Sequence, residues 1–155
     1  IIILFSFALF SEPIKEGDNL ESLNLIEYED QFGEIQKIKT EDRILIFASD
    51  MDGTKIAHEV FKQKGEGYLK EKKSIFIGDI HKMPWLISKF IALPKMRKYP
   101  YKIFLIKDDK KGDNFNKGKG KLTGYKIENF VIKEFQIISN TDELILFMEE
   151  KSSKK

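Results

Sequence analysis

Three short, uninterrupted runs of apolar residues occur along the chain, at residues 44–48, 75–77 and 103–106. Each run is rich in isoleucine and phenylalanine, and none alternates with polar residues. Strands with this pattern are apolar on both faces, which is typical of a sheet covered on both sides. The runs therefore predict three buried strands at the centre of an α/β sheet.

Apolar residues at helical spacing fill the two gaps between these runs. The first stripe begins after Thr54, ends at Gly65 and Gly67, and consists of Ile56, Ala57, Val60 and Phe61. The second gap opens with Pro84, which suits a first helical turn, and we expect Pro94 to kink or end that helix. The apolar face of this second helix is Trp85, Leu86, Ile87, Phe90 and Ile91, and we expect Trp85 to pack in the core or at a groove edge.

Turn signals add a hairpin before this unit and antiparallel strands after it. The sequence Asp-Gln-Phe-Gly at residues 30–33 predicts the turn of a hairpin, because Gly33 can adopt positive φ. A loop rich in lysine and glycine at 110–120 precedes strand-like residues 122–127 and 130–138. A last helix is expected from about Asn140.

The two ends of the chain differ from its middle. An apolar run followed by a polar stretch makes residues 1–11 resemble the end of a signal peptide, although a buried strand is the alternative. We expect residues 12–24 to be a lead-in, 25–150 the domain and 151–155 a lysine-rich tail. The signal hypothesis predicts an exported, periplasmic protein without a stable membrane anchor once the signal is removed.

The amino-acid composition excludes some functions of the protein and makes others unexpected. Lysine and arginine total 27 against 25 acidic residues, and only Arg43 and Arg97 are arginines, so we do not expect a nucleic-acid partner. The chain has no cysteine, which excludes disulfides and thiol chemistry, and its two histidines do not predict a metal site. No glycine fingerprint follows a strand, so we expect no cofactor.

The element order and three local sequences resemble those of thioredoxin-like proteins. These sequences are residues 30–33, residues 49–54 where the family opens its first long helix, and residues 92–101, Ala-Leu-Pro-Lys-Met-Arg-Lys-Tyr-Pro-Tyr. They are similar to small exported members in which redox cysteines are not fixed. The resemblance implies a three-layer α/β/α domain with a mixed central sheet and an N-terminal hairpin. It further implies that Pro100 is the family's cis-proline.

The same resemblance places a binding groove on this chain. Met51 and Thr54 fall where relatives carry the CxxC pair, and they hold no sulfur nucleophile. The implied groove lies between this helix start and Tyr99-Pro100, where a protein or peptide would bind. We therefore expect a binding or accessory protein without thiol redox activity rather than an enzyme.

One motif points to a different class of protein. Asp50-Met51-Asp52-Gly53-Thr54 matches the DxDGT motif of Mg²⁺-dependent haloacid-dehalogenase-type phosphatases. In that class Asp50 would attack phosphorus, Asp52 would protonate the leaving oxygen, and Asp79 would help to hold the metal. The serine or threonine expected at the next strand end is missing from residues 77–80. The alternative interpretation is a turn and helix N-cap.

Overall fold

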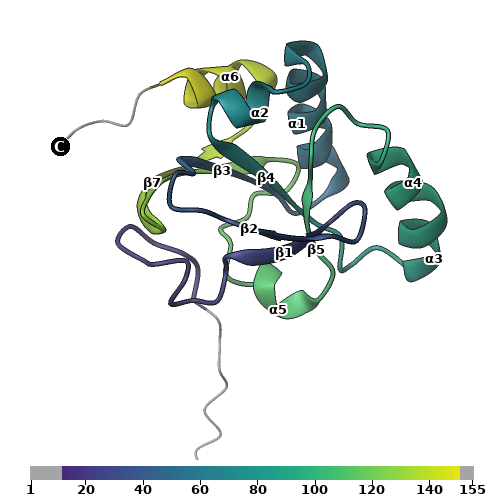
Figure 1. Ribbon diagram of the computed structural model, residues 1–155, viewed down its shortest axis with the longest axis horizontal. Helices are drawn as coiled ribbons and strands as arrows, with labels where there is room; N and C mark the ends of the chain where they lie inside the picture. The colour runs from purple at the N-terminus through teal and green to yellow at the C-terminus, as the bar shows by residue number, and fades with distance from the viewer. Residues whose placement is uncertain (1–11, 151–155) are drawn as a thin grey trace, which may run out of the picture.

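A sheet of seven strands in the order β2-β1-β5-β4-β3-β6-β7 forms the centre of the molecule (Figure 1). The computed structural model describes residues 12–150, apart from the side chain of Asp109, so the predicted signal remnant and tail lie outside the described residues. The strands are β1 (Glu27–Asp30), β2 (Ile35–Lys37), β3 (Ile44–Ala48), β4 (Ser74–Asp79), β5 (Phe104–Ile106), β6 (Leu122–Glu128) and β7 (Val131–Ile138). Strands β3, β4 and β5 are parallel and the other pairings are antiparallel, so the sheet is mixed.

The predicted buried strands occupy the middle of this sheet. All five residues of β3 are buried, and β3 pairs with β4 from Ile44 opposite Ser74 to Ala48 opposite Gly78.

The helices are α1 (Met51–Lys64), α2 (Tyr68–Glu71), α3 (Trp85–Ile87), the π-helical turn η1 (Ser88–Ala92), α4 (Leu93–Met96), α5 (Asp109–Gly112) and α6 (Thr141–Glu149). No helix in the described part of the chain is long and apolar enough to cross a membrane.

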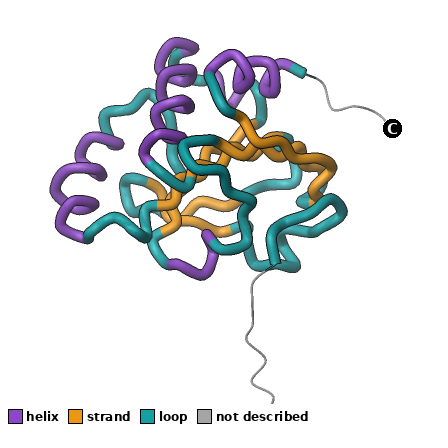
Figure 2. The backbone as a smooth tube through the Cα atoms, turned by 180° about the vertical axis from the view of Figure 1, so that it is seen from behind, coloured by secondary structure: helices purple, strands orange, loops and turns teal. Residues whose placement is uncertain are grey.

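The two faces of the sheet are covered differently. Helices α1, α2, α4 and α6 pack on one face, where Phe61 and Phe147 are buried. The other face is covered by residues 12–25 and by the segment after α5, and Figures 1 and 2 show these below the sheet and the long helices above it. The expected lead-in 12–24 thus contributes Ile14 and Leu20 to the second core.

The termini of α6 are capped by side chains. Asn140 Oδ1 accepts a hydrogen bond from the Glu143 backbone N–H at 2.9 Å, which is the predicted start of this helix. At the other end Lys126, buried on β6, donates from Nζ to the carbonyl oxygens of Phe147 and Glu150. A lysine in this position satisfies carbonyls that have no partner inside the helix.

The second predicted helix differs from expectation in two ways. It runs through Pro94, because the π-helical turn η1 lets Leu93 N–H bond to Ser88 O and the missing proline N–H falls just beyond it. The five side chains of its predicted apolar face point to solvent instead of the core, and Trp85 is two-thirds exposed. Met96, at the end of α4, is the residue of this segment that is buried.

Candidate functional site

The start of α1 is held by Asp50, which follows the central strand β3. Asp50 has extended backbone angles, and its Oδ1 accepts a hydrogen bond from the Gly53 backbone N–H at 2.8 Å. Its Oδ2 accepts another from the Gly120 backbone N–H at 2.7 Å. Both carboxylate oxygens are therefore bonded to the backbone. Asp50 is therefore the N-cap of α1, as the alternative interpretation of the DxDGT motif predicted.

The first turn of α1 packs tightly against the chain that enters β6. A Cβ atom on the buried Gly53 would lie 2.5 Å from the Lys121 carbonyl oxygen, which is closer than real Cβ contacts. Glycine is thus required by backbone proximity rather than by its own φ angle. The segment 118–121 closes this end of the helix.

Tyr99 contacts the middle of α1 rather than the helix start. The Tyr99 ring lies against His58, with ring centroids 4.1 Å apart, two turns beyond Met51. Every peptide bond in the described residues is trans, so the expected cis-proline at Pro100 is wrong. The strand order explains why the segment before β5 does not meet the start of α1. Strand β6 is the direct neighbour of β3, whereas β4 separates β3 from β5.

His58 forms a small aromatic cluster that the sequence analysis missed. Its Nδ1 lies 2.6 Å from the Tyr101 hydroxyl, and the Tyr99 and Tyr101 rings stack with centroids 5.4 Å apart. Burial lowers the pKa of His58, and the positive charges of Lys62 and Lys95 lower it further. Burial also raises the pKa of Tyr101. This cluster is therefore neutral near pH 7.

The three carboxylates of the phosphatase hypothesis lie in separate environments. Asp52 is exposed and pairs with Lys55 at 3.3 Å. The side chain of Asp79 at the end of β4 is only 3% exposed. Its Oδ1 accepts from the His81 backbone N–H at 3.1 Å and lies 2.6 Å from His81 Nδ1. The other oxygen of Asp79 lies so close to Gly112 that a Cβ there would collide with it. Among the side chains that the structure describes, which exclude that of Asp109, no three from His, Asp or Glu converge as metal ligands would.

The Asp-Gln-Phe-Gly turn ties the hairpin to the segment before β5. The Gln31 Nε2 donates to the Tyr101 carbonyl at 2.9 Å, and its Oε1 accepts from the Ile103 N–H at 2.9 Å. The Arg97 Nε donates to the Gln31 carbonyl at 2.9 Å. Two of the three sequences that carry the family resemblance, residues 30–33 and 92–101, are thus bonded to each other.

Asp30 closes the turn itself. Its Oδ1 accepts from the N–H groups of Phe32 and Glu34 at 2.8 and 3.0 Å. Burial acts to raise the pKa of Asp30, but these hydrogen bonds, one from Gln36 and the charge of Lys102 outweigh it and lower the pKa. The buried carboxylate is therefore a structural part of the hairpin.

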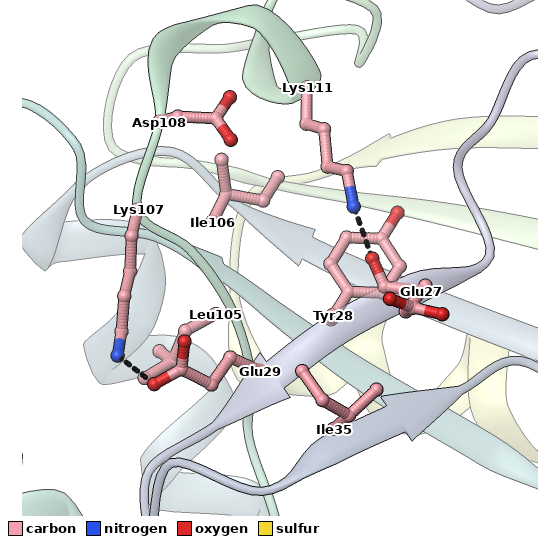
Figure 3. A pocket seen from close by; sticks show the side chains of 9 residues that line it. All are labelled: Glu27, Tyr28, Glu29, Ile35, Leu105, Ile106, Lys107, Asp108 and Lys111. Carbon is pink, nitrogen blue, oxygen red and sulfur yellow. Dashed lines mark hydrogen bonds and ion pairs between the residues drawn. The ribbon is translucent and has the colours of Figure 1, made fainter.

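A hollow of about 190 Å³ lies between β1, β2, β5 and α5 (Figure 3). Its charged side chains bond to their neighbours: Lys107 pairs with Glu29 at 2.6 Å, and Lys111 donates to the Glu27 carbonyl and lies over the Tyr28 ring. Figure 3 shows these contacts on the wall of the hollow. They bind the outer strands to α5.

Comparison with known proteins supports the architecture. No family model and no curated protein matches the sequence. Among solved structures, a peroxiredoxin-like protein from Aquifex aeolicus is similar with a TM-score of 0.52 at 9% identity, over 90% of this chain and 89% of that one. A protein described as thiol:disulfide interchange protein DsbE from Chlorobium tepidum is similar with a TM-score of 0.55 at 14% identity, over 87% and 99%. The chain has a thioredoxin-like fold.

Proposed function

We propose that the chain is an exported binding or accessory protein in which a thioredoxin-like domain works without thiol redox chemistry. The observation that carries this proposal is the start of α1. The chain has no cysteine, and both carboxylate oxygens of Asp50 accept hydrogen bonds from backbone N–H groups there. A carboxylate held in this way stabilises the fold and has no oxygen free of a bonded donor for attack on a substrate.

The partner we propose is a protein or peptide that meets one side of α1. Met51, Thr54 and His58 follow one another at helical spacing along this side, and Tyr99 lies against His58. Pro100 follows Tyr99 and is exposed. We define the α1 strip as these five residues. It combines an exposed thioether, a hydroxyl and aromatic rings, which suit contact with a peptide.

Export is part of the proposal because of the sequence that precedes the domain. Residues 1–10 are almost entirely apolar and are followed by Ser11, Glu12 and Pro13, a pattern typical of the end of a secretion signal. A cysteine-free chain also avoids unwanted oxidation in an oxidising compartment.

Site-specific photo-crosslinking tests the proposal with a matched control. A photoreactive phenylalanine analogue replaces Met51 on the α1 strip or Leu146 on α6 in the full chain, since these side chains are 56% and 60% exposed. In cells that make the protein, we expect position 51 to yield a discrete crosslinked species in the extracytoplasmic fraction and position 146 to yield none. The same pattern from both positions, or no product from position 51, would contradict the proposal.

A further inference from the structure

The segment from α3 to α4 presents a large apolar surface to solvent. Five side chains are between 43% and 67% exposed: Trp85, Leu86, Ile87, Phe90 and Ile91. In the described chain they are five of the eleven large apolar residues that are exposed, and they fall within seven consecutive positions. An exposed cluster of this kind on a soluble domain marks an interaction surface.

The helix geometry separates this surface from the core. Leu93 and Met96 pack against the core cluster on the inner side of the segment. Leu86, Ile87, Phe90 and Ile91 recur at i, i+1, i+4 and i+5, so they share the opposite side. Figures 1 and 2 show the segment at the lateral edge of the molecule, at the far end from β7. The apolar face is therefore open to a large, flat partner.

The charges along this part of the chain are of one sign. Residues 80–107 contain seven lysines and arginines and no aspartate or glutamate, although the whole chain has 25 acidic residues. The exposed basic residues within 82–98 are Lys82, Lys89, Lys95, Arg97 and Lys98. The Lys89 Nζ lies 5.7 Å from the Trp85 ring centroid and 5.6 Å from that of Phe90. Basic and apolar side chains are thus interleaved.

We propose that residues 82–98 bind the surface of an anionic lipid membrane. A helix with tryptophan, phenylalanine and leucine on one side and lysines around it lies in the headgroup region of a bilayer, with its apolar side chains among the acyl chains. Each lysine near such a surface strengthens binding, because its positive charge is attracted by the negative potential of the lipids. Binding of this kind is reversible and needs no membrane-spanning segment.

Charge favours lipid over a second copy of the chain. A symmetric dimer through this face would bring the two basic clusters together, and like charges in contact oppose association. An anionic bilayer neutralises the same lysines while it covers the apolar side chains. This inference goes beyond the proposed partner on the α1 strip, because its test contains lipid and no second protein.

Trp85 makes the test direct, because it is the single tryptophan of the chain. The full chain is titrated with vesicles of phosphatidylglycerol and phosphatidylcholine in equal parts, and with vesicles of phosphatidylcholine alone. We expect the Trp85 emission to shift to shorter wavelength with the anionic vesicles only, and the shift to shrink at high salt.

Variants assign the binding to this segment. We expect Leu86→Ser with Phe90→Ser to weaken vesicle binding by about tenfold or more, because two apolar side chains are lost from the interface. Lys82→Gln, Lys89→Gln and Lys95→Gln should weaken it by about fivefold each. The controls are Leu146→Ser on α6 and Lys133→Gln on β7, which lie elsewhere and should bind like the unchanged chain.

Four results would overturn the proposal. An unchanged Trp85 emission with anionic vesicles would show that the face does not enter lipid. Equal binding to both kinds of vesicle would show that the lysines do not select anionic lipid. Full binding by the Leu86→Ser, Phe90→Ser variant would assign the contact to another part of the chain. A dimer in analytical ultracentrifugation that this double variant abolishes would identify a second copy as the occupant.

Discussion

Two helical segments follow the neighbouring parallel strands β3 and β4 and pack on the same face of the sheet. They differ in how much of each segment is covered by the rest of the chain. The start of α1 is closed, because Asp50 binds two backbone N–H groups and Gly53 lies against the Lys121 carbonyl. The segment from α3 to α4 is open, with Trp85 and Phe90 mostly in solvent.

The difference separates residues that hold the fold from residues that face solvent. Asp50 and Gly53 at the start of α1 stabilise the domain, so their replacement should lower the free energy of unfolding. Residues on the open face contribute little to the fold, so their exposure is better explained by contact with something outside the chain. Substitutions in the two regions should therefore have different consequences.

Between these two regions, the largest effect is expected at the N-cap of α1. Asp50→Ala removes both bonds to the Gly53 and Gly120 N–H groups and should lower the free energy of unfolding by about 2–3 kcal/mol. Urea denaturation measures this loss. Asp52→Ala, at an exposed carboxylate two residues away, should change it by less than about 0.5 kcal/mol. Equal effects of the two substitutions would mean that Asp50 is not a structural cap.

Gly53→Ala should lower stability by about 1–3 kcal/mol, because the added methyl group meets the backbone carbonyl of Lys121 and the segment 118–121 must shift. At an exposed helical site the same change would raise stability by about 1 kcal/mol. Thermal unfolding of Gly53→Ala, with Lys55→Ala at an exposed position as the control, distinguishes this loss of stability from that gain. A more stable Gly53→Ala variant would show that α1 and this segment are not in contact.

His58 should make stability depend on pH. The pKa of His58 in the folded state is lowered from its ordinary value of 6.5. The contribution of His58 to the free energy of unfolding is therefore highest above pH 6.5 and decreases as pH falls from 6.5 through the lowered pKa of the folded state. Denaturant unfolding between roughly pH 7 and pH 5 should show a smaller loss for His58→Gln than for the unchanged chain, since glutamine does not titrate. The same slope in both proteins would contradict the burial of His58 against Tyr99 and Tyr101.

The smallest effect on stability is expected on the open face. Leu86→Ser combined with Phe90→Ser should change the free energy of unfolding by about 1 kcal/mol or less, because both side chains already contact water. Phe61→Ala on α1, where the ring is buried, should cost about 3–5 kcal/mol in the same urea experiment. A large loss in the double variant would mean that the face packs within the chain.

Local pattern predicted the central elements well. The continuous apolar runs became β3, β4 and β5, because residues buried on both faces leave an unmistakable sequence. The helix starts at Asp50 and Asn140 were also predictable, since capping depends on residues only three positions apart.

Features that depend on long-range packing were not predictable. Helical spacing marked Phe90 as part of an apolar face but could not tell whether that face meets core or solvent. The segment that meets the start of α1 was not predictable either, because the strand order places β6 rather than β5 beside β3. The bonds of Gln31 to Tyr101 and Ile103 join residues about 70 positions apart, and nothing local to Gln31 indicates them.

The most direct test of the closed helix start combines turnover with stability. The full chain and Asp50→Asn are incubated with Mg²⁺ and p-nitrophenyl phosphate, and both are unfolded in urea. We predict no hydrolysis above buffer by either protein and a lower stability of Asp50→Asn, whose amide cannot accept the bond from Gly120 while it caps Gly53. Mg²⁺-dependent hydrolysis by the unchanged chain that Asp50→Asn abolishes would contradict the account and make Asp50 a nucleophile.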